Sequence, residues 1–222
     1  WSAGKIPPKR EVVLLSSDGA EKQFEFLGIK HRKVANVSDL LRAAKPSSVL
    51  AISGQTEISD EDAASLRAFQ KKGGKLLLLN CKEAAKKIYP EYIKNWIIPT
   101  EGDIVVMERE DASVFDQIPE MKLRYFNNNK REIPRACNAT LKVERDKNVV
   151  ELAGQMRIHA YIDGGKPEDR IKKIDSMRGF PLVQINDGKG KAIVSTMCTD
   201  KAQTDPIAGR LLSNMVKVLV LE

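Results

Sequence analysis

Two short apolar runs in the first half of the chain flank a stretch whose apolar residues follow helical spacing. The first run, Val49 to Ile52, ends in Ser53-Gly54-Gln55, and the second run is Leu76 to Leu79. Between them, Ser59 precedes three acidic residues, as at the start of a helix, and Gly73-Gly74 marks the helix end. We therefore predict two buried strands joined by one helix, and strands connected in this way lie parallel.

The remainder of the first half continues this alternation of strands and helices. Further strands are predicted at Glu11 to Ser16 and at Ile29 to Val34. Short helices are predicted at Ala20 to Leu27, Ser38 to Ala44 and Glu83 to Ile88. The alternation is typical of an α/β protein with a doubly wound, mostly parallel sheet. In such sheets ligands bind beyond the carboxyl ends of the strands, so the residues that follow the buried strands are candidates for a site.

The second half begins with a change of pattern, because strand-like runs replace helical periodicity from about residue 103 to residue 180. These runs are Ile104 to Met107, Lys122 to Phe126, Ala139 to Val143, Val149 to Leu152 and Arg157 to Ile162. They predict a β-rich insertion into the α/β domain or an extension of its sheet. After it, Pro181 to Ile185 and Lys191 to Thr196 flank the turn residues Asn186 to Gly190, which predicts a hairpin. A last helix is predicted to begin at Pro206.

The domain organisation that these patterns predict is simple. Residues 11–222 are expected to form a single α/β domain, and residues 1–10 a linker from a preceding domain. The chain begins with Trp1 instead of Met, and Pro7-Pro8 stands in a stretch with neither a helical pattern nor the apolar core of a signal peptide.

Charge and hydropathy argue against two classes of partner. The net charge of the 222 residues is +7, but basic residues are scattered among acidic ones. Aromatic residues make up 5% of the chain and do not interleave with the basic clusters, as a stacking surface for nucleic acid requires. No apolar run approaches the roughly 20 residues of a membrane span. We therefore predict neither nucleic acid nor a membrane as a partner.

The residue types that can bind metals or form disulfides, such as Cys, Asp and Glu, form no recognisable motif in this sequence. Cys81, Cys137 and Cys198 are an odd set without CxxC spacing, so they suggest neither a zinc site nor a disulfide framework, and buried free thiols explain them best. The acidic run Asp60-Glu61-Asp62 fits the first turn of a helix better than a metal site. We predict no metal and no cofactor.

Three stretches of the sequence share their order and spacing with a known family. They are AISGQTEISDEDAASLRAFQKKGGKLLLLN, LAGQMRIHAYI and GFPLVQINDGKGKAIVSTMCTDKAQTDPIAGRLLSNMV. Together they resemble the glutamine amidotransferase class I-like domain that is appended to some glycoside hydrolases, including family 2 β-galactosidase-like enzymes. The resemblance implies a flavodoxin-like sheet and a parent chain that acts on carbohydrate, in the periplasm or secreted. Other domains of that parent are the expected partners, and a homo-oligomer is an open alternative.

Working amidotransferases of this superfamily use a cysteine nucleophile in a glycine-flanked elbow and a downstream His-x-Glu pair. Cys81 occupies the matching position after a buried strand, but its neighbours are Asn80 and Lys82. Where the His-x-Glu pair is expected, the chain has the sequence MCTD at residues 197–200. Its two histidines, His31 and His159, fall elsewhere. A thiol without an imidazole is poorly activated, so Cys81 is only a weak candidate for catalysis.

The residues that follow the same strands could also line a pocket that binds a ligand without catalysing a reaction. The loop Ser53-Gly54-Gln55 resembles the one that supplies oxyanion-hole amides in working relatives, although Gly54 also suits a simple turn. The predicted rim of such a residual pocket is Ser53, Gly54, Gln55, Asn80, Cys81 and Asp200. His159 and Tyr161, on one alternating strand, are a second candidate ligand face.

Three functions therefore stay open from the sequence. The first is a non-catalytic accessory or structural domain of a larger glycoside hydrolase. The second is a divergent cysteine hydrolase or amidotransferase that uses Cys81, and the third is a module that binds a sugar or another small ligand.

The dispersed charge yields a first testable prediction. Binding to duplex DNA should be weak, should show no sequence preference and should vanish at physiological salt, because scattered cations release few counterions together. Fluorescence anisotropy with labelled duplexes at several salt concentrations would measure it. Submicromolar affinity at physiological salt would contradict the prediction and restore a nucleic-acid role.

Overall fold

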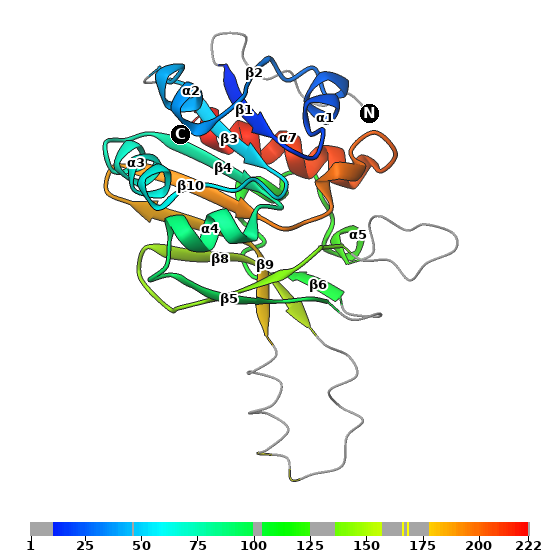
Figure 1. Ribbon diagram of the computed structural model, residues 1–222. Coiled ribbons are helices and arrows are strands. Elements are labelled where there is room, and N and C mark those ends of the chain that lie inside the picture. The colour runs from blue at the N-terminus through cyan, green and yellow to red at the C-terminus, as the bar shows by residue number, and fades with distance from the viewer. Residues whose placement is uncertain are drawn as a thin grey trace.

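A ten-stranded mixed sheet runs through the part of the chain that the computed structural model describes (Figure 1). The described residues are 11–45, 47–99, 104–124, 136–156 and 178–221, with the single residues 166 and 168. The strands are β1 (Val12–Ser16), β2 (His31–Val34), β3 (Val49–Ser53), β4 (Lys75–Leu79), β5 (Ile93–Ile97), β6 (Ile104–Met107), β7 (Thr140–Val143), β8 (Val149–Met156), β9 (Gly179–Asp187) and β10 (Gly190–Ser195). The helices are α1 (Glu21–Phe26), α2 (Val37–Arg42), α3 (Asp60–Lys71), α4 (Lys82–Ile88), α5 (Glu120–Leu123) and α7 (Pro206–Leu221), with 3-10 turns η1 (Ser113–Phe115) and η3 (Thr199–Lys201).

The first half of the sheet is parallel and has the order β2-β1-β3-β4-β10. This is the 2-1-3-4-5 order of flavodoxin-like sheets. The predicted unit of two buried strands joined by a helix is β3-α3-β4, whose strands pair in parallel from Val49 opposite Lys75 to Ser53 opposite Leu79. The predicted fold class, an α/β protein with a flavodoxin-like doubly wound sheet, is confirmed.

Helices cover both faces of the parallel half, and each face has its own core. α1 and α7 pack on one face around Phe24 and Leu211, whereas α2, α3 and α4 pack on the other around Leu40, Leu66 and Ile88. α3 begins where the sequence predicts, with a capping box in which the side chains of Ser59 and Asp62 bond each other's backbone N–H. In Figure 1, α7 lies behind the sheet and α3 and α4 lie in front of it.

The second half of the sheet is antiparallel and comes from the β-rich stretch of the sequence. β9 pairs with β10, β8 and β7, while β6 and β5 extend the sheet beyond β8 and β7. One expected strand is wrong: residues 120–123 form the short helix α5 after Pro119, and residues 125 and 126 lie outside the described residues. A run this short cannot distinguish a period of 2 from 3.6, and Pro119 followed by Glu120 favours a helix start. The strand expected at 157–162 also lies outside the described residues, and β5 was not predicted.

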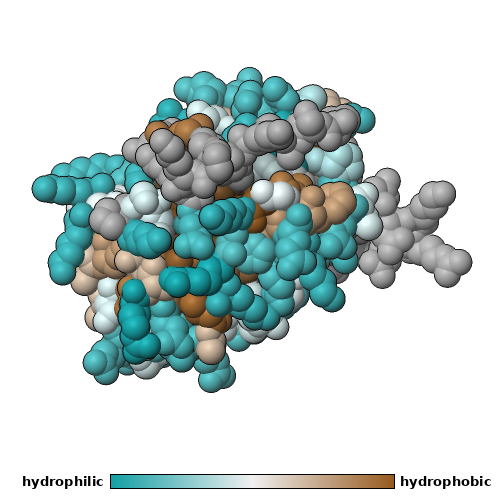
Figure 2. Space-filling view, turned by 90° about the horizontal axis from the view of Figure 1, so that it is seen from above, coloured by the Kyte–Doolittle hydropathy of each residue, from teal (hydrophilic) through white to brown (hydrophobic). Residues whose placement is uncertain are grey.

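The outer edge at β2 is protected by charge. Arg32 and Lys33 are exposed on this four-residue strand, and short edge strands that carry cations resist pairing with other chains. Seen from above, the coloured surface is mostly hydrophilic, and apolar residues show in patches between the hydrophilic side chains (Figure 2).

The hairpin between β9 and β10 docks against the end of α3. Its turn is tighter than expected, because only Gly188 and Lys189 stand between the paired residues Asp187 and Gly190. Lys189 N–H donates to the carbonyl of Lys71, 3.1 Å away. The hairpin therefore reaches α3 closely enough to leave no room for side chains at its glycines.

The second prediction tests this close approach. A Cβ at Gly190 would stand 2.0 Å from the carbonyl oxygen of Gln70, which is backbone and cannot move alone. Gly190→Ala should therefore lower the free energy of unfolding by about 2 kcal/mol or more, measured by urea denaturation. Lys189→Ala, on the exposed turn, is the control and should stay within about 0.5 kcal/mol of the wild type. Equal stability of the two variants would contradict the packing described.

Candidate functional site

The carboxyl ends of β1, β3, β4 and β10 meet at one edge of the sheet and bring polar side chains together. Asp18, after β1, accepts hydrogen bonds from Ser53 Oγ at 2.9 Å, Ser16 Oγ at 3.1 Å and the N–H of Ala20 at 3.2 Å. These bonds tie the loop after β1 to the end of β3. The carboxylate of Asp18 is thus the centre of a hydrogen-bonded corner at the switch point of the sheet.

Only glycine fits at position 54 of this corner, because a side chain there would clash with neighbouring atoms. Its φ of +81° is left-handed, and a Cβ there would stand 2.6 Å from Ser17 Oγ and 2.9 Å from Asp18 Cβ. Its N–H donates to the carbonyl of Leu79 at 2.9 Å, so this amide is already bonded within the fold. The amide of an oxyanion hole has to be free for the substrate, and the amide of Gly54 is not.

Asn80, the first residue after β4, has a strained backbone conformation. Its φ of +53° is left-handed, a conformation that asparagine tolerates better than most residues, and its N–H donates to the carbonyl of Ser195 at 2.7 Å. Its side-chain oxygen accepts a hydrogen bond from Asn138 Nδ2 at 3.0 Å. Asn138 comes from the β-rich stretch, and no local pattern in the sequence indicates that it reaches the strand ends.

The side chain of Cys81 is buried in the fold and is not accessible to a substrate. The residue is 3% exposed, and its thiol lies 3.6 Å from the carbonyl oxygen of Ile52, to which it donates. Burial raises the pKa of the thiol to about 12, and the negative charge of Asp18 adds to the effect. The side chain is therefore a neutral thiol at physiological pH, which is a weak nucleophile.

In the described part of the chain, neither a histidine nor the ammonium group of Lys82 lies where it could lower the pKa of the Cys81 thiol. His31 pairs with Val12 at the start of β1, so it lies at the opposite edge of the sheet from Cys81. Its Nδ1 is 3.0 Å from the carbonyl oxygen of Ile29. Lys82 places its ammonium group 5.2 Å from the centre of the Trp96 ring. His159 and Tyr161 lie outside the described residues.

The six residues of the predicted rim do not line one pocket. Ser53, Asn80 and Asp200 line a small polar cavity of about 20 Å³ together with Asp18 and Gln23, room for roughly one water molecule. Gln23 Oε1 is buried there without a hydrogen-bond partner among the described residues. The sequence did not indicate Gln23, because nothing in its local pattern distinguishes it from an ordinary helix residue.

The other three predicted residues stand at one end of a much larger groove. Gly54, Gln55 and Cys81 line a hollow of about 1020 Å³ that runs between α3 and α4. Its floor is apolar, with Ile58 and Ile88, and charged side chains line its rim. Cys81 belongs to the wall of this groove, so the residues that follow the strands are divided between the groove and the small cavity.

Two further properties concern the described residues alone. No group of three or more His, Cys, Asp or Glu side chains among them is arranged to hold a metal ion. None of the helices that the structure describes is long and apolar enough to cross a membrane.

Comparison with known proteins gives a fold but no close relative. No protein-family model matches the chain, and no curated protein matches its sequence. A ThuA-like protein from Bacteroides uniformis has a similar structure at 12% identity and a TM-score of 0.55, over 97% of this chain and 93% of that one. A β-galactosidase from Rahnella sp. R3 matches at 10% identity and a TM-score of 0.56, over 98% of this chain and 32% of the enzyme. The carbohydrate deacetylase Agd3 matches at 10% identity and a TM-score of 0.54, over 96% of this chain and 32% of the enzyme.

These identities establish the shared fold and nothing finer. The chain spans nearly the whole ThuA-like protein but only about a third of the two enzymes. The neighbours support a flavodoxin-like fold, and the same fold occurs within the longer chains of the β-galactosidase and the carbohydrate deacetylase.

The third prediction follows from the pKa of the Cys81 thiol. The unfolded chain loses this proton near pH 8.5, whereas the folded chain keeps it up to about pH 12. The folded state thus binds more protons between these values, so this thiol contributes stability that is complete below about pH 8.5 and declines as pH rises toward 12. In Cys81→Ala, the free energy of unfolding should fall less steeply with pH over this range.

Urea denaturation between pH 7 and pH 10.5 would measure this slope. Iodoacetamide labelling of the native protein should also be slow at Cys81, and should become fast in denaturant. A native thiolate that titrates below neutrality, or an unchanged slope in Cys81→Ala, would contradict the description of Cys81 as an enclosed neutral thiol.

Proposed function

We propose that this chain is a non-catalytic accessory module of a larger glycoside hydrolase, of the family 2 β-galactosidase-like type. The observation that carries the proposal is the state of Cys81. The nucleophile position of the amidotransferase-like fold is kept, but its thiol is buried, protonated and bonded to Ile52. An enzyme that used this cysteine would need the opposite arrangement, an accessible thiolate with a base beside it.

The amide groups at the same edge support the proposal. The N–H of Gly54 and the N–H of Asn80 both donate to carbonyl groups of neighbouring strands. Donors that are used inside the fold stabilise the sheet and leave no preorganised site for a developing negative charge. The strand ends therefore act as a structural corner.

The structural neighbours supply the carbohydrate context. A β-galactosidase and a carbohydrate deacetylase each contain a region of this fold that corresponds to about a third of their length. A region that forms one part of a longer enzyme has neighbouring domains of the same chain as its partners. We propose the same arrangement here, with residues 1–10 as the connection to a preceding domain and the sugar chemistry outside residues 1–222.

The fourth prediction tests the module in its parent chain. Removing residues 1–222 from the full-length protein should lower its Tm or disrupt its assembly, because a neighbour that packs against the module loses buried surface. The kcat/KM of the folded remainder for a glycoside should change by no more than about twofold. Differential scanning fluorimetry, size-exclusion chromatography and steady-state kinetics would measure these effects.

The 222-residue chain alone provides the matching control. It should hydrolyse neither glutamine nor an aryl glycoside, and Cys81→Ala should leave this unchanged. Glutaminase activity that Cys81→Ala abolishes would favour the divergent cysteine hydrolase instead. Glycoside hydrolysis by the isolated chain would overturn the proposal.

A further inference from the structure

Two lysines of α4 and a tryptophan of β5 form a cluster that the strand-end site does not include. Lys82 and Lys86 are one helical turn apart and lie on the same side of α4. Their ammonium nitrogens lie 5.2 and 5.6 Å from the centre of the Trp96 ring. All three side chains are partly exposed, so the cluster is open to solvent.

The cluster concentrates positive charge without an acid to balance it. Within the described residues, neither Lys82 nor Lys86 forms an ion pair with an acidic side chain. Glu83, the acid between them in sequence, and Lys86 both line the groove toward α3, but no ion pair joins these two side chains in the described part of the chain. Lys87 differs from both, because it lies 3.2 Å from Asp60 and donates to the carbonyl of Ile58. Like charges one turn apart on a helix are unfavourable, and an anion placed between them would offset that cost.

Trp96 keeps the two ammonium groups close to one ring, so that a single anion can bind both of them. The negative face of an indole ring attracts cations, so the ring restricts the two long side chains to one region of the surface. Restricting groups before a ligand arrives lowers the entropy cost of binding. On the other side, Trp96 packs with the apolar core of this face of the sheet and stands opposite the buried Leu141. The ring is therefore itself fixed.

Exposed apolar surface lies next to this charge. Ile98, two residues beyond Trp96, is 52% exposed. The exposed edge of the indole provides a non-polar surface beside the two cations, and the exposed Ile98 follows two residues later in the chain. A ligand that suits both has a non-polar face and a negative group a few ångströms away.

We propose that Lys82, Lys86 and Trp96 form a binding site for an acidic sugar, a pyranose that bears a carboxylate or a sulfate. The anionic group lies between the two ammonium groups, and the C–H face of the pyranose lies against the exposed edge of the Trp96 ring. The choice of a sugar rests on the proposed function, whereas the need for a negative group with an adjoining non-polar face comes from the cluster itself. Trp96 acts here as a positioning residue for the lysines.

The fifth prediction concerns binding to the 222-residue chain, measured by isothermal titration calorimetry. The probes are a trisaccharide of galacturonic acid, a sulfated galactose trisaccharide, neutral galactotriose and inorganic sulfate. One or both acidic sugars should bind at least about tenfold more tightly than the neutral sugar and than sulfate alone. Raising the salt concentration should weaken the binding, since exposed charges are screened. Comparison of the carboxylate and sulfate probes identifies the anionic group.

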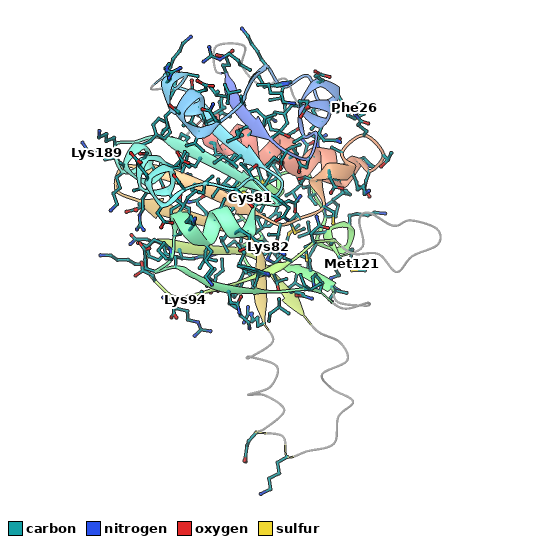
Figure 3. All side chains as sticks on the ribbon, in the orientation of Figure 1. Phe26, Cys81, Lys82, Lys94, Met121 and Lys189 are labelled. Carbon is teal, nitrogen blue, oxygen red and sulfur yellow. The ribbon has the colours of Figure 1, made fainter. Side chains whose placement is uncertain are left out.

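Matched variants connect the binding to the cluster. Lys82→Gln and Lys86→Gln should each weaken binding by about fivefold, while Lys82→Arg, which keeps the charge, should bind as the wild type does within about twofold. Lys94→Gln is the control, because Lys94 lies on the same strand as Trp96, projects outward in Figure 3 and contacts the carbonyl of Pro90. It should leave the affinity unchanged. Thermal unfolding of each variant verifies that the fold is retained.

Several results would overturn the proposed site. They are equal binding of neutral and acidic sugars, binding of sulfate alone as tight as that of the sulfated sugar, absence of binding to both acidic sugars, and an effect of Lys94→Gln as large as that of Lys82→Gln. Duplex DNA that binds more tightly than either acidic sugar would also overturn it. None of these outcomes affects the deletion experiment on the parent chain, so the failure of this site and the failure of the accessory role are distinguishable.

Discussion

The register of three apolar strands that are buried on both faces is the constraint on which the rest of the structure depends. β4 lies between β3 and β10, and Leu79 stands opposite both Ser53 and Ser195. Because the three strands end level, the loops that follow them meet at one edge. The backbone bonds from Gly54 to Leu79 and from Asn80 to Ser195 then join the loops to neighbouring strands. A shift of one residue in this register would separate the polar corner and reverse the side chains of the central strand.

The same constraint accounts for the burial of Cys81. Cys81 is the N-cap residue of α4, two residues after the end of β4, and the packing of α4 against the sheet encloses its thiol against the carbonyl of Ile52. Working sites place the nucleophile on a turn that projects it beyond the sheet, which requires small residues on both sides. Here Asn80 and Lys82 stand on either side. The burial that stabilises the sheet is thus also what keeps this thiol neutral.

Much of the fold could be predicted from sequence, and the reasons differ between elements. The unit from Val49 to Leu79 has two uninterrupted apolar runs, an N-terminal cap and a glycine stop, so local pattern and final structure agree. α5 and β5 were not foreseen, since four or five residues carry too little periodicity and their conformation is decided by tertiary packing. The candidate site was predicted only in part. Each strand end was identified, but Asn138 and Gln23 reach the site through the packing of distant elements, which leaves no local signal.

The position of β10 in the sheet has a consequence for how the chain folds during its synthesis. β4 is made early, yet the strand that covers its second edge is β10, near the end of the chain. Until β10 emerges from the ribosome, β4 presents an open, strongly apolar edge, although β1, β2 and β3 have already formed beside it. Open edges of this kind pair readily with strands of other molecules. A chain that ends before residue 190 lacks the strand that covers this edge of Leu76 to Leu79, so we expect it to aggregate more readily than the full chain.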